Sequence, residues 1–225
     1  MASPSTPATP PDGTVYFVRH GLVHNPERIA YGWLPRFRLA DEGRAQAAAT
    51  AEFLAARAIA FVLTSPLLRA RQTSGFIAEK LPAVPLRRSR LLIESGLAHY
   101  WEGTPWAEIP ERHAAVWQQF DKAASTVEAG ESLAAMAERM RAAFALALRL
   151  SGGAPAVCVS HRDPILALRL AIEGRTFDEL HTTTCNPASV TQIEARDGVL
   201  RLVEYAEAYV APPTGRYGAP VRPSA

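Results

Sequence analysis

Cysteine is scarce in this sequence, with Cys158 and Cys185 the only two among 225 residues. Their spacing suits neither a metal site nor a disulfide framework, so we expect two isolated, packed thiols in a reducing, cytoplasmic compartment. Long apolar runs are also absent, which argues against a membrane-spanning helix. Neither sign of charge dominates, because 24 basic residues stand against 22 acidic ones. This balance predicts no nucleic-acid partner, and the lack of long apolar runs predicts no membrane partner.

The two ends of the chain are poor in large apolar residues. Residues 1–13 are rich in Pro, Ser, Thr and Ala, and they contain neither the basic cluster nor the apolar stretch of a signal peptide. Residues 211–225 hold four prolines and two glycines. We therefore expect a disordered arm over 1–13, a single domain over 14–210 and a disordered tail over 211–225. The composition of the chain does not indicate whether the protein is a monomer or an oligomer.

Short β-branched runs alternate with helical segments along the rest of the chain. We expect strands over 15–18, 60–64, 84–86 and 155–160, and helices over 41–57, 65–80, 105–122, 131–150 and from 163 onward. A closing hairpin over 188–205 turns at Asp197-Gly198. The residues expected to cap helices are Asp41, Ser65 and Asp163. The face that the first helix is expected to bury consists of Ala45, Ala48, Ala49 and Phe53. This alternation predicts an α/β fold with parallel strands.

Three groups suited to phosphate follow predicted strands. Arg19-His20-Gly21 comes directly after the first strand, Ser160-His161 ends the last parallel one, and Arg69 lies just beyond the second. Arginine offers a planar fork of donors that matches phosphate oxygens, and a glycine lets the backbone turn and approach a ligand closely. Because the carboxyl ends of parallel strands meet at one edge of a sheet, we expect these segments to converge there. The predicted chemistry is phosphate capture.

Four motifs occur in a fixed order. They are Arg19-His20-Gly21, the run Ser-Pro-Leu-Leu-Arg-Ala-Arg-Gln-Thr over 65–73, Glu94 with Trp101-Glu102-Gly103, and Ser160-His161. In this order they resemble the histidine phosphatase superfamily, in its phosphoglycerate mutase-like branch, over residues 14–205. The resemblance implies a three-layer α/β sandwich, with a mostly parallel central sheet and helices on both faces. It also implies a metal-independent phosphomonoesterase that acts on a small organic phosphate and needs no cofactor.

The resemblance assigns roles to the residues that would meet the phosphoryl group. His20 is expected to be the nucleophile and to form a phosphohistidine that water then hydrolyses. Arg19, Arg69 and His161 are expected to bind the transferred group and neutralise the charge on its oxygens. Arg71, two residues beyond Arg69, faces elsewhere and is expected to be structural.

The resemblance also implies an acid, a base and further substrate contacts. Glu94 is the expected proton donor to the leaving oxygen and afterwards the base toward water. Glu102 is its rival, but the family places its acid ahead of the Trp-Glu-Gly element. Gly21 and Asn25 are expected to contact the substrate phosphate, although Asn25 falls one residue earlier than in the mutases. Gly130-Glu131-Ser132 resembles a family element for which a helix-capping role is expected.

Two positions depart from the family pattern. Leu22 stands where a Glu or Gln is usual, so a polar contact near the nucleophile or the substrate is missing. Arg162 follows His161 where the family often has glycine, and we expect its side chain to project into solvent.

Three alternatives to a phosphatase stay open. A mutase would return the phosphoryl group to a second hydroxyl with the same residues, and a noncatalytic phosphoester-binding protein would keep the fold without turnover. A metal site would use His20, His24 and His161. The aromatic residues of the loops 25–38 and 94–106 are expected mainly to anchor those loops, with one or two of them lining a pocket for an apolar or ring-bearing leaving group.

Overall fold

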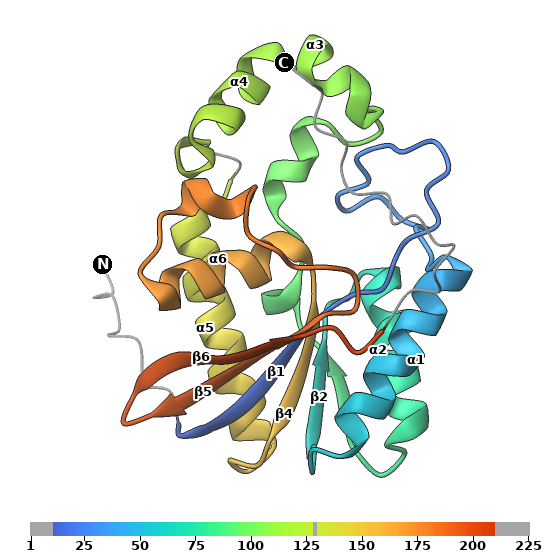
Figure 1. The fold of residues 1–225 in the computed structure, drawn as a ribbon, viewed down its shortest axis with the longest axis vertical. Coiled ribbons are helices and arrows are strands. Elements are labelled where there is room, and N and C mark those ends of the chain that lie inside the picture. Colours follow the sequence, from blue (N-terminus) through green and yellow to red (C-terminus); the bar gives the residue numbers. More distant parts are fainter. Residues whose placement is uncertain (1–10, 128–129, 210–225) are drawn as a thin grey trace, which may run out of the picture.

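The computed structural model describes residues 11–127 and 130–209, whose strands form one six-stranded sheet (Figure 1). The strands are β1 (Gly13–Arg19), β2 (Phe61–Thr64), β3 (Leu86–Arg88), β4 (Ala156–Ser160), β5 (Val190–Arg196) and β6 (Val199–Ala206). Their order across the sheet is β3-β2-β4-β1-β5-β6. The first four strands run parallel, whereas β5 is antiparallel to β1 and forms a hairpin with β6. The predicted α/β class and the closing hairpin are confirmed.

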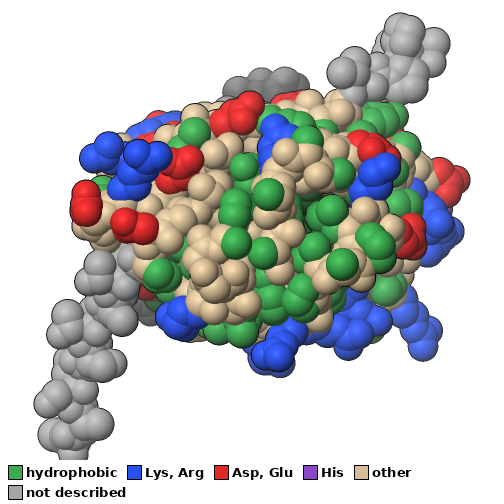
Figure 2. All heavy atoms as spheres, turned by 90° about the horizontal axis from the view of Figure 1, so that it is seen from below, with side chains coloured by type: hydrophobic (Ala, Val, Ile, Leu, Met, Phe, Trp, Pro, Cys, Tyr) green, Lys and Arg blue, Asp and Glu red, His purple; other side chains and the backbone are tan. Residues whose placement is uncertain are grey.

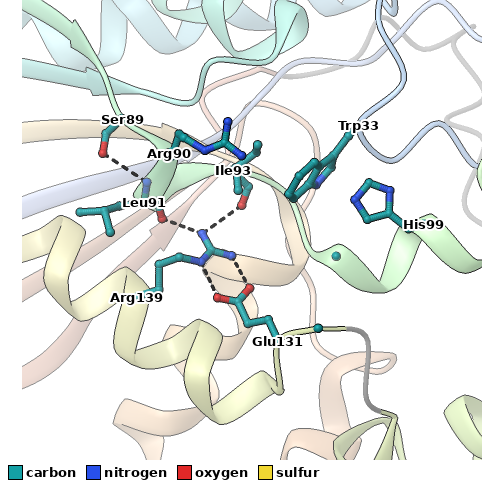
Figure 3. A pocket seen from close by; sticks show the side chains of 10 residues that line it. Trp33, Ser89, Arg90, Leu91, Ile93, His99, Glu131 and Arg139 are labelled. Carbon is teal, nitrogen blue, oxygen red and sulfur yellow. Dashed lines mark hydrogen bonds and ion pairs between the residues drawn. The ribbon is translucent and has the colours of Figure 1, made fainter. Parts of the chain in front are cut away.

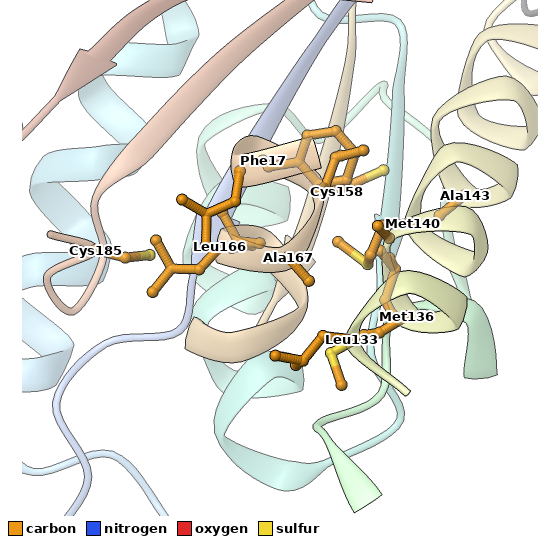
Figure 4. Packing of buried hydrophobic residues seen from close by; sticks show 14 of the residues in the cluster. Phe17, Leu133, Met136, Met140, Ala143, Cys158, Leu166, Ala167 and Cys185 are labelled. Atoms are coloured by element: carbon orange, nitrogen blue, oxygen red, sulfur yellow. The ribbon is translucent and has the colours of Figure 1, made fainter. Parts of the chain in front are cut away.

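Helices cover both faces of the sheet, and the sheet separates the core into two clusters. The long helices are α1 (Asp41–Ala55), α2 (Leu68–Lys80), α5 (Leu133–Leu150) and α6 (Arg162–Glu173). Along β1 and β4, alternate side chains point to opposite faces. Phe17 and Cys158 pack against α5 and α6, where Figure 4 shows them beside Met140 and Leu166. Tyr16 and its neighbours in the second cluster pack against α1 and α2. The predicted three-layer sandwich is therefore confirmed.

The segment between β3 and α5 consists of short elements rather than the expected helix over 105–122. These elements are η1 (Arg90–Leu92), η2 (Gly96–Tyr100), η3 (Trp106–Glu108), α3 (Ile109–Arg112), α4 (Ala114–Lys122) and η4 (Ala124–Thr126). A further short element, η5 (Phe177–Leu180), follows α6. Pro110 lies in the first turn of α3, where its missing N–H costs nothing, but it cannot continue the turn before it. Proline therefore divides this segment.

The buried face of α1 differs from the expected one. The side chains it buries are Gln46, Ala47, Thr50, Ala51 and Leu54. Of the expected residues, Ala45 is exposed, Ala48 and Ala49 are half-buried, and Phe53 is half-buried and packs against the second core cluster. Alanine-rich helices offer little contrast in hydrophobicity, so the sequence pattern does not fix which side turns inward. Here two polar residues do so: Gln46 accepts the Leu22 N–H at 2.8 Å, and Thr50 donates to the Ala188 carbonyl at 2.7 Å.

The helix caps and the third strand also differ in detail. α1, α2 and α6 are preceded by Ala40, Leu67 and His161, so Asp41, Ser65 and Asp163 are not the caps. Ser132 caps α5 as predicted, because its side chain accepts the Ala135 N–H at 3.1 Å. β3 lies two residues beyond the predicted 84–86, since Pro85 has no N–H to donate and pairs only through its carbonyl.

The predicted terminal segments fall largely outside the described residues. Of the arm over 1–13, only residues 11–13 are described, and Gly13 is already the first residue of β1; the whole tail over 211–225 lies beyond them. Cys158 and Cys185 are both free and buried, which confirms the expected packed thiols. Within the described part of the chain, no helix combines the length and the apolar character needed to cross a bilayer.

Candidate active site

The predicted phosphate-binding segments meet at the carboxyl edge of the parallel strands. β1 ends in Arg19 and β4 ends in Ser160, and the pairing of the two strands places these residues side by side. The next amide, that of His20, donates to the Ser160 carbonyl at 3.0 Å. Figure 2 shows the molecule from the opposite edge, where Lys and Arg side chains gather along the rim and no histidine is seen. The charged and titratable groups of interest therefore share one edge of the sheet.

His20 is buried directly after β1, with an exposed fraction of 2%. Its Nδ1 lies 2.8 Å from the Gly21 carbonyl oxygen, and its Nε2 lies 3.2 Å from the Arg69 Nε. A carbonyl only accepts and a guanidinium only donates, which assigns the proton to Nδ1 and a lone pair to Nε2. Burial, reinforced by the Arg69 and Arg19 cations, lowers the pKa of His20 well below its usual value. His20 is therefore a neutral imidazole whose Nε2 lone pair accepts the Arg69 Nε–H.

Arg69 brings a buried cation to the same place. It is the second residue of α2 and is 1% exposed. Its Nη2 donates to the Gly32 carbonyl at 2.8 Å and lies 3.9 Å from the Glu94 Oε2. The Tyr31 ring centre lies 4.8 Å from the guanidinium carbon, within the range of a cation–π contact. The Arg69 guanidinium is thus held in place by Gly32, Glu94 and Tyr31.

His161 follows β4 and is fully buried. Its ring centre lies 5.1 Å from that of His20. The Nε2 of His161 forms a 2.7 Å hydrogen bond with the Ser65 Oγ, and its Nδ1 lies 3.7 Å from the Glu94 Oε2. Burial, followed by the positive charge of Arg69, lowers the pKa of His161 well below its usual value. His161 is therefore also neutral near pH 7.

Glu94 lies between the two histidines and Arg69, just after η1. Its side chain is 14% exposed, and its Oε1 accepts the Ser95 N–H at 2.9 Å. Burial raises the pKa of Glu94 to about 7, and the Asp163 carboxylate adds to the rise while Arg69 opposes it. A carboxyl group with a pKa near 7 both gives and takes a proton at neutral pH.

Arg19 adds a second guanidinium and an unpaired donor. Its Nη1 donates to the Cys185 carbonyl at 2.6 Å. Among the described residues, the buried side-chain polar atoms without a hydrogen-bond partner are the Arg19 Nε and the His161 Nδ1. An unpaired buried donor is costly, so such atoms mark a place where a ligand supplies the missing acceptor.

The charges at this edge favour an oxyanion over a metal cation. His20, Glu94 and His161 each offer a ligand atom, and these atoms lie within 4.8 Å of one another. Arg69 and Arg19, however, place two fixed positive charges beside them, which repel a divalent cation and attract an anion. His24, the third histidine considered for a metal site, is exposed.

Two predicted substrate contacts use their polar atoms elsewhere. Asn25 donates from Nδ2 to the Ile29 carbonyl at 2.8 Å and accepts the Ile29 N–H at 3.1 Å, so both ends of its amide hold its own loop. The Gly21 amide donates to the Thr73 Oγ1 at 3.1 Å. A Cβ on Gly21 would lie 2.4 Å from the Gly43 carbonyl oxygen, so glycine is required here by packing against α1. The hydrogen bonds of Asn25 and Gly21 therefore do not support the predicted contacts of these two residues with the substrate phosphate.

The remaining residues singled out from the sequence have structural partners. The Glu102 Oε1 accepts the Trp33 N–H at 2.5 Å and lies 3.1 Å from the His99 Nδ1, whereas Glu94 is the carboxylate beside His20 and His161. The expectation that Arg162 projects into solvent is wrong, because it donates to the Leu180 carbonyl at 2.6 Å. That carbonyl ends η5 and has no partner within its own helix.

Sequence reasoning indicated an anchoring or pocket-lining role for the aromatic residues of the loop 25–38, but it missed the contacts of Tyr31–Trp33 with Arg69 and Glu94. Gly32 and Tyr31 contact Arg69 as described, and the Trp33 Nε1 donates to the Glu94 carbonyl at 3.0 Å. The only available signal was the aromatic content of this loop, and the predicted anchoring role fits Trp33. The sequence pattern does not show which side chains this loop contacts, because the partners are more than thirty residues apart in the chain. Gly32 and Arg69, for example, are 37 residues apart.

A cavity of about 530 Å³ lies beside Trp33 and the segment that carries Glu94. Its lining includes Trp33, Arg90, Ile93, Gly96, His99 and Arg139 (Figure 3). Arg139 donates to the Leu91 and Ile93 carbonyls and to both oxygens of Glu131, so its charge is neutralised. Arg90 is exposed, stands 6.0 Å from the Trp33 ring centre, and has no ion-pair partner among the described residues.

Comparison with known proteins decides the family. The family model of the histidine phosphatase superfamily (branch 1) matches residues 15–208. The chain belongs to this superfamily. Uncharacterized protein Rv0525 of Mycobacterium tuberculosis is 39% identical over 187 residues, which cover 82% of this chain and 91% of the relative. Phosphoserine phosphatase 1 of Hydrogenobacter thermophilus is 26% identical over 170 residues, covering 73% and 79% of the two chains.

A solved phosphatase structure has the same fold. A mycobacterial glucosyl-3-phosphoglycerate phosphatase in complex with VO3 superposes with a TM-score of 0.71 at 28% identity, over 84% of this chain and 97% of that one. The resemblance inferred from the four motifs is therefore confirmed at the level of family and fold. The histidine phosphatase relatives named here are phosphatases of small phosphate compounds or proteins without an assigned activity.

Proposed function

We propose that this histidine phosphatase is a metal-independent phosphomonoesterase, which transfers the phosphoryl group of a small organic phosphate first to His20 and then to water. The observation that carries the proposal is the neutral His20, whose Nε2 lone pair lies beside Arg69 and whose Nδ1 is held by the Gly21 carbonyl. The phosphatase activity in the names of two relatives supports hydrolysis over mutase chemistry.

In the first step, the His20 Nε2 attacks phosphorus and the bond between phosphorus and the leaving oxygen breaks. Glu94 enters as the carboxylic acid and gives its proton to the leaving oxygen, which departs as an alcohol. Arg19, Arg69 and the His161 Nδ1–H neutralise the charge on the phosphoryl oxygens in the loose transition state. The products of this step are a phosphohistidine and a Glu94 carboxylate.

In the second step, water attacks the phosphorus of the phosphohistidine. The Glu94 carboxylate takes a proton from the water, the bond between phosphorus and Nε2 breaks, and its electron pair returns to His20. Inorganic phosphate leaves, and both His20 and Glu94 recover their starting states. The carboxyl group therefore needs a pKa close to the working pH, as the burial of Glu94 provides.

We place the leaving group toward the cavity that contains Trp33 and Arg90. Trp33 contacts the backbone of Glu94, so this cavity adjoins the residue that would protonate the leaving oxygen. The ring of Trp33 supports the earlier expectation that one aromatic residue meets an apolar or ring-bearing leaving group. The cytoplasmic location inferred from the two cysteines stays a prediction.

The decisive experiment compares purified wild type, His20→Ala and His24→Ala on a generic aryl phosphate, with a chelator present. We expect wild-type turnover to survive the chelator and His20→Ala to lose on the order of 10⁴-fold in kcat. His24→Ala removes an exposed histidine four positions away and should behave as wild type. Because the P–N bond of phosphohistidine is labile in acid, quenching during turnover in alkaline denaturant should yield a phosphorylated peptide that contains His20.

Each alternative predicts a different result. A noncatalytic binder gives no turnover in any variant but retains affinity for inorganic phosphate. A mutase converts one phosphoglycerate into another without stoichiometric release of phosphate. Loss of wild-type activity in the chelator would favour a metal ion on His20, Glu94 and His161. Any of these outcomes would overturn the proposal.

A further inference from the structure

Ser65 is a fully buried serine that contacts the active site, although it was expected only to cap a helix. It follows β2 directly, and its amide donates to the Val159 carbonyl at 2.9 Å, which ties it to β4. Its Oγ lies 2.7 Å from the Nε2 of His161. The Leu67 N–H also points to this oxygen, at 3.4 Å. The hydroxyl therefore stands between the start of α2 and the second histidine.

The hydrogen of a buried hydroxyl requires an acceptor, and the contacts of Ser65 leave one choice. The Leu67 N–H is a donor, so it occupies a lone pair of the Oγ. Among the described residues, the acceptor that lies within hydrogen-bond distance of the Ser65 Oγ is the His161 Nε2. We propose that Ser65 donates to this nitrogen and thereby fixes His161 in the neutral tautomer that carries its proton on Nδ1.

The tautomer matters because Nδ1 is the atom that faces the reaction. It is buried, has no hydrogen-bond partner among the described residues, and lies 3.7 Å from the Glu94 Oε2. With a proton on Nδ1, His161 presents a donor to a phosphoryl oxygen. With the other tautomer, it presents a lone pair, which repels that oxygen. Ser65 is thus a positioning residue that acts through His161, and this inference rests on the proposed function.

The test combines a spectroscopic readout with kinetics. In ¹⁵N NMR spectra of wild type, we expect the His161 ring to show a protonated Nδ1 and a bare Nε2, while Ser65→Ala should show a mixture of tautomers. We also expect Ser65→Ala to lose about 10- to 100-fold in kcat, the range seen when a partner that orients a functional histidine is removed. Ser65→Thr keeps the hydroxyl and should restore the wild-type ring pattern.

Ser74→Ala is the matched control. Ser74 is a buried serine of α2 whose hydroxyl donates to the Arg71 carbonyl at 3.0 Å, so its loss removes a similar bond without touching His161. Equal kinetic losses in Ser65→Ala and Ser74→Ala would assign Ser65 a merely structural role. A wild-type spectrum with the proton on Nε2 would overturn the proposal even if Ser65→Ala failed to fold. Because the spectrum needs no turnover, it separates failure of this inference from failure of the proposed phosphatase activity.

Discussion

The buried cluster of His20, Arg69, Glu94 and His161, called the centre below, and the open cavity beside it are built in contrasting ways. In the centre, His20, Arg69 and His161 are each at most 2% exposed, and hydrogen bonds fix their orientation. In the cavity, the His99 side chain is 46% exposed, and Arg90 has no ion-pair partner among the described residues. All phosphomonoesters share the group that the centre would bind, so it can be arranged in advance. The leaving group varies, and exposed side chains can be exchanged without disturbing the core.

Glu94→Gln should give the largest effect in the centre. For an alkyl phosphate, whose leaving oxygen must be protonated, we expect kcat to fall by about 10²- to 10⁴-fold. The pKa of Glu94 is raised to about 7, so the acid form is lost as pH rises through that value, and wild-type activity should decline above it. The lowered pKa of His20 keeps the nucleophile neutral on the acid side. The measurement is the pH profile of kcat/KM for both proteins.

Glu102→Gln serves as the matched control for that profile. It makes the same change in the rival carboxylate, which contacts Trp33 and His99 instead of the histidines of the centre. The substrate phosphate titrates near pH 6 in every protein, so only the difference between variants is interpreted. If Glu102→Gln abolished the decline above pH 7 and Glu94→Gln kept it, the acid would be Glu102.

Arg69→Lys should give the next largest effect, about 10²- to 10³-fold in kcat for every substrate. Lysine keeps the charge but cannot reach the Gly32 carbonyl and the His20 Nε2 with one planar group. Arg71→Lys, two residues along the same helix and exposed, should leave kcat unchanged. Thermal unfolding of both variants checks that the loss does not come from instability. A substrate-dependent loss in Arg69→Lys would place Arg69 at the leaving group instead.

The two histidines of the centre were predictable because each one follows a strand with a clear sequence pattern, whereas Glu94 was expected from the family resemblance. His20 and His161 follow apolar strands, and parallel strands bring their carboxyl ends together. The support around them was not predictable. Ser65 reads as a helix cap, yet it bonds His161, 96 positions away. Gln46 and Thr50 were not among the residues expected on the buried face of α1, yet they turn inward and bond the backbone at Leu22 and Ala188.

The cavity was the least predictable part. Its residues come from the loop after β1, from η1 and η2, and from α5, and their exposure leaves no periodic pattern in the sequence. The aromatic content of the loops indicated a pocket but not which ring would line it. Such positions depend on how loops of irregular conformation pack together, which local propensities do not determine.

Arg90→Gln should give the smallest effect and should depend on the substrate. Because Arg90 is a cation in the cavity without an ion-pair partner among the described residues, we expect KM to rise about three- to tenfold for a phosphoester whose leaving group carries a carboxylate. A neutral aryl phosphate should be unaffected. Arg87→Gln makes the same charge change at an exposed position of β3 outside the cavity lining. Equal rises in KM in the two variants would mean that general electrostatic attraction, and not the cavity, accounts for the preference for a carboxylate-bearing substrate. A rise in KM confined to Arg90→Gln would assign substrate choice to the cavity and leave the chemical step to the buried centre.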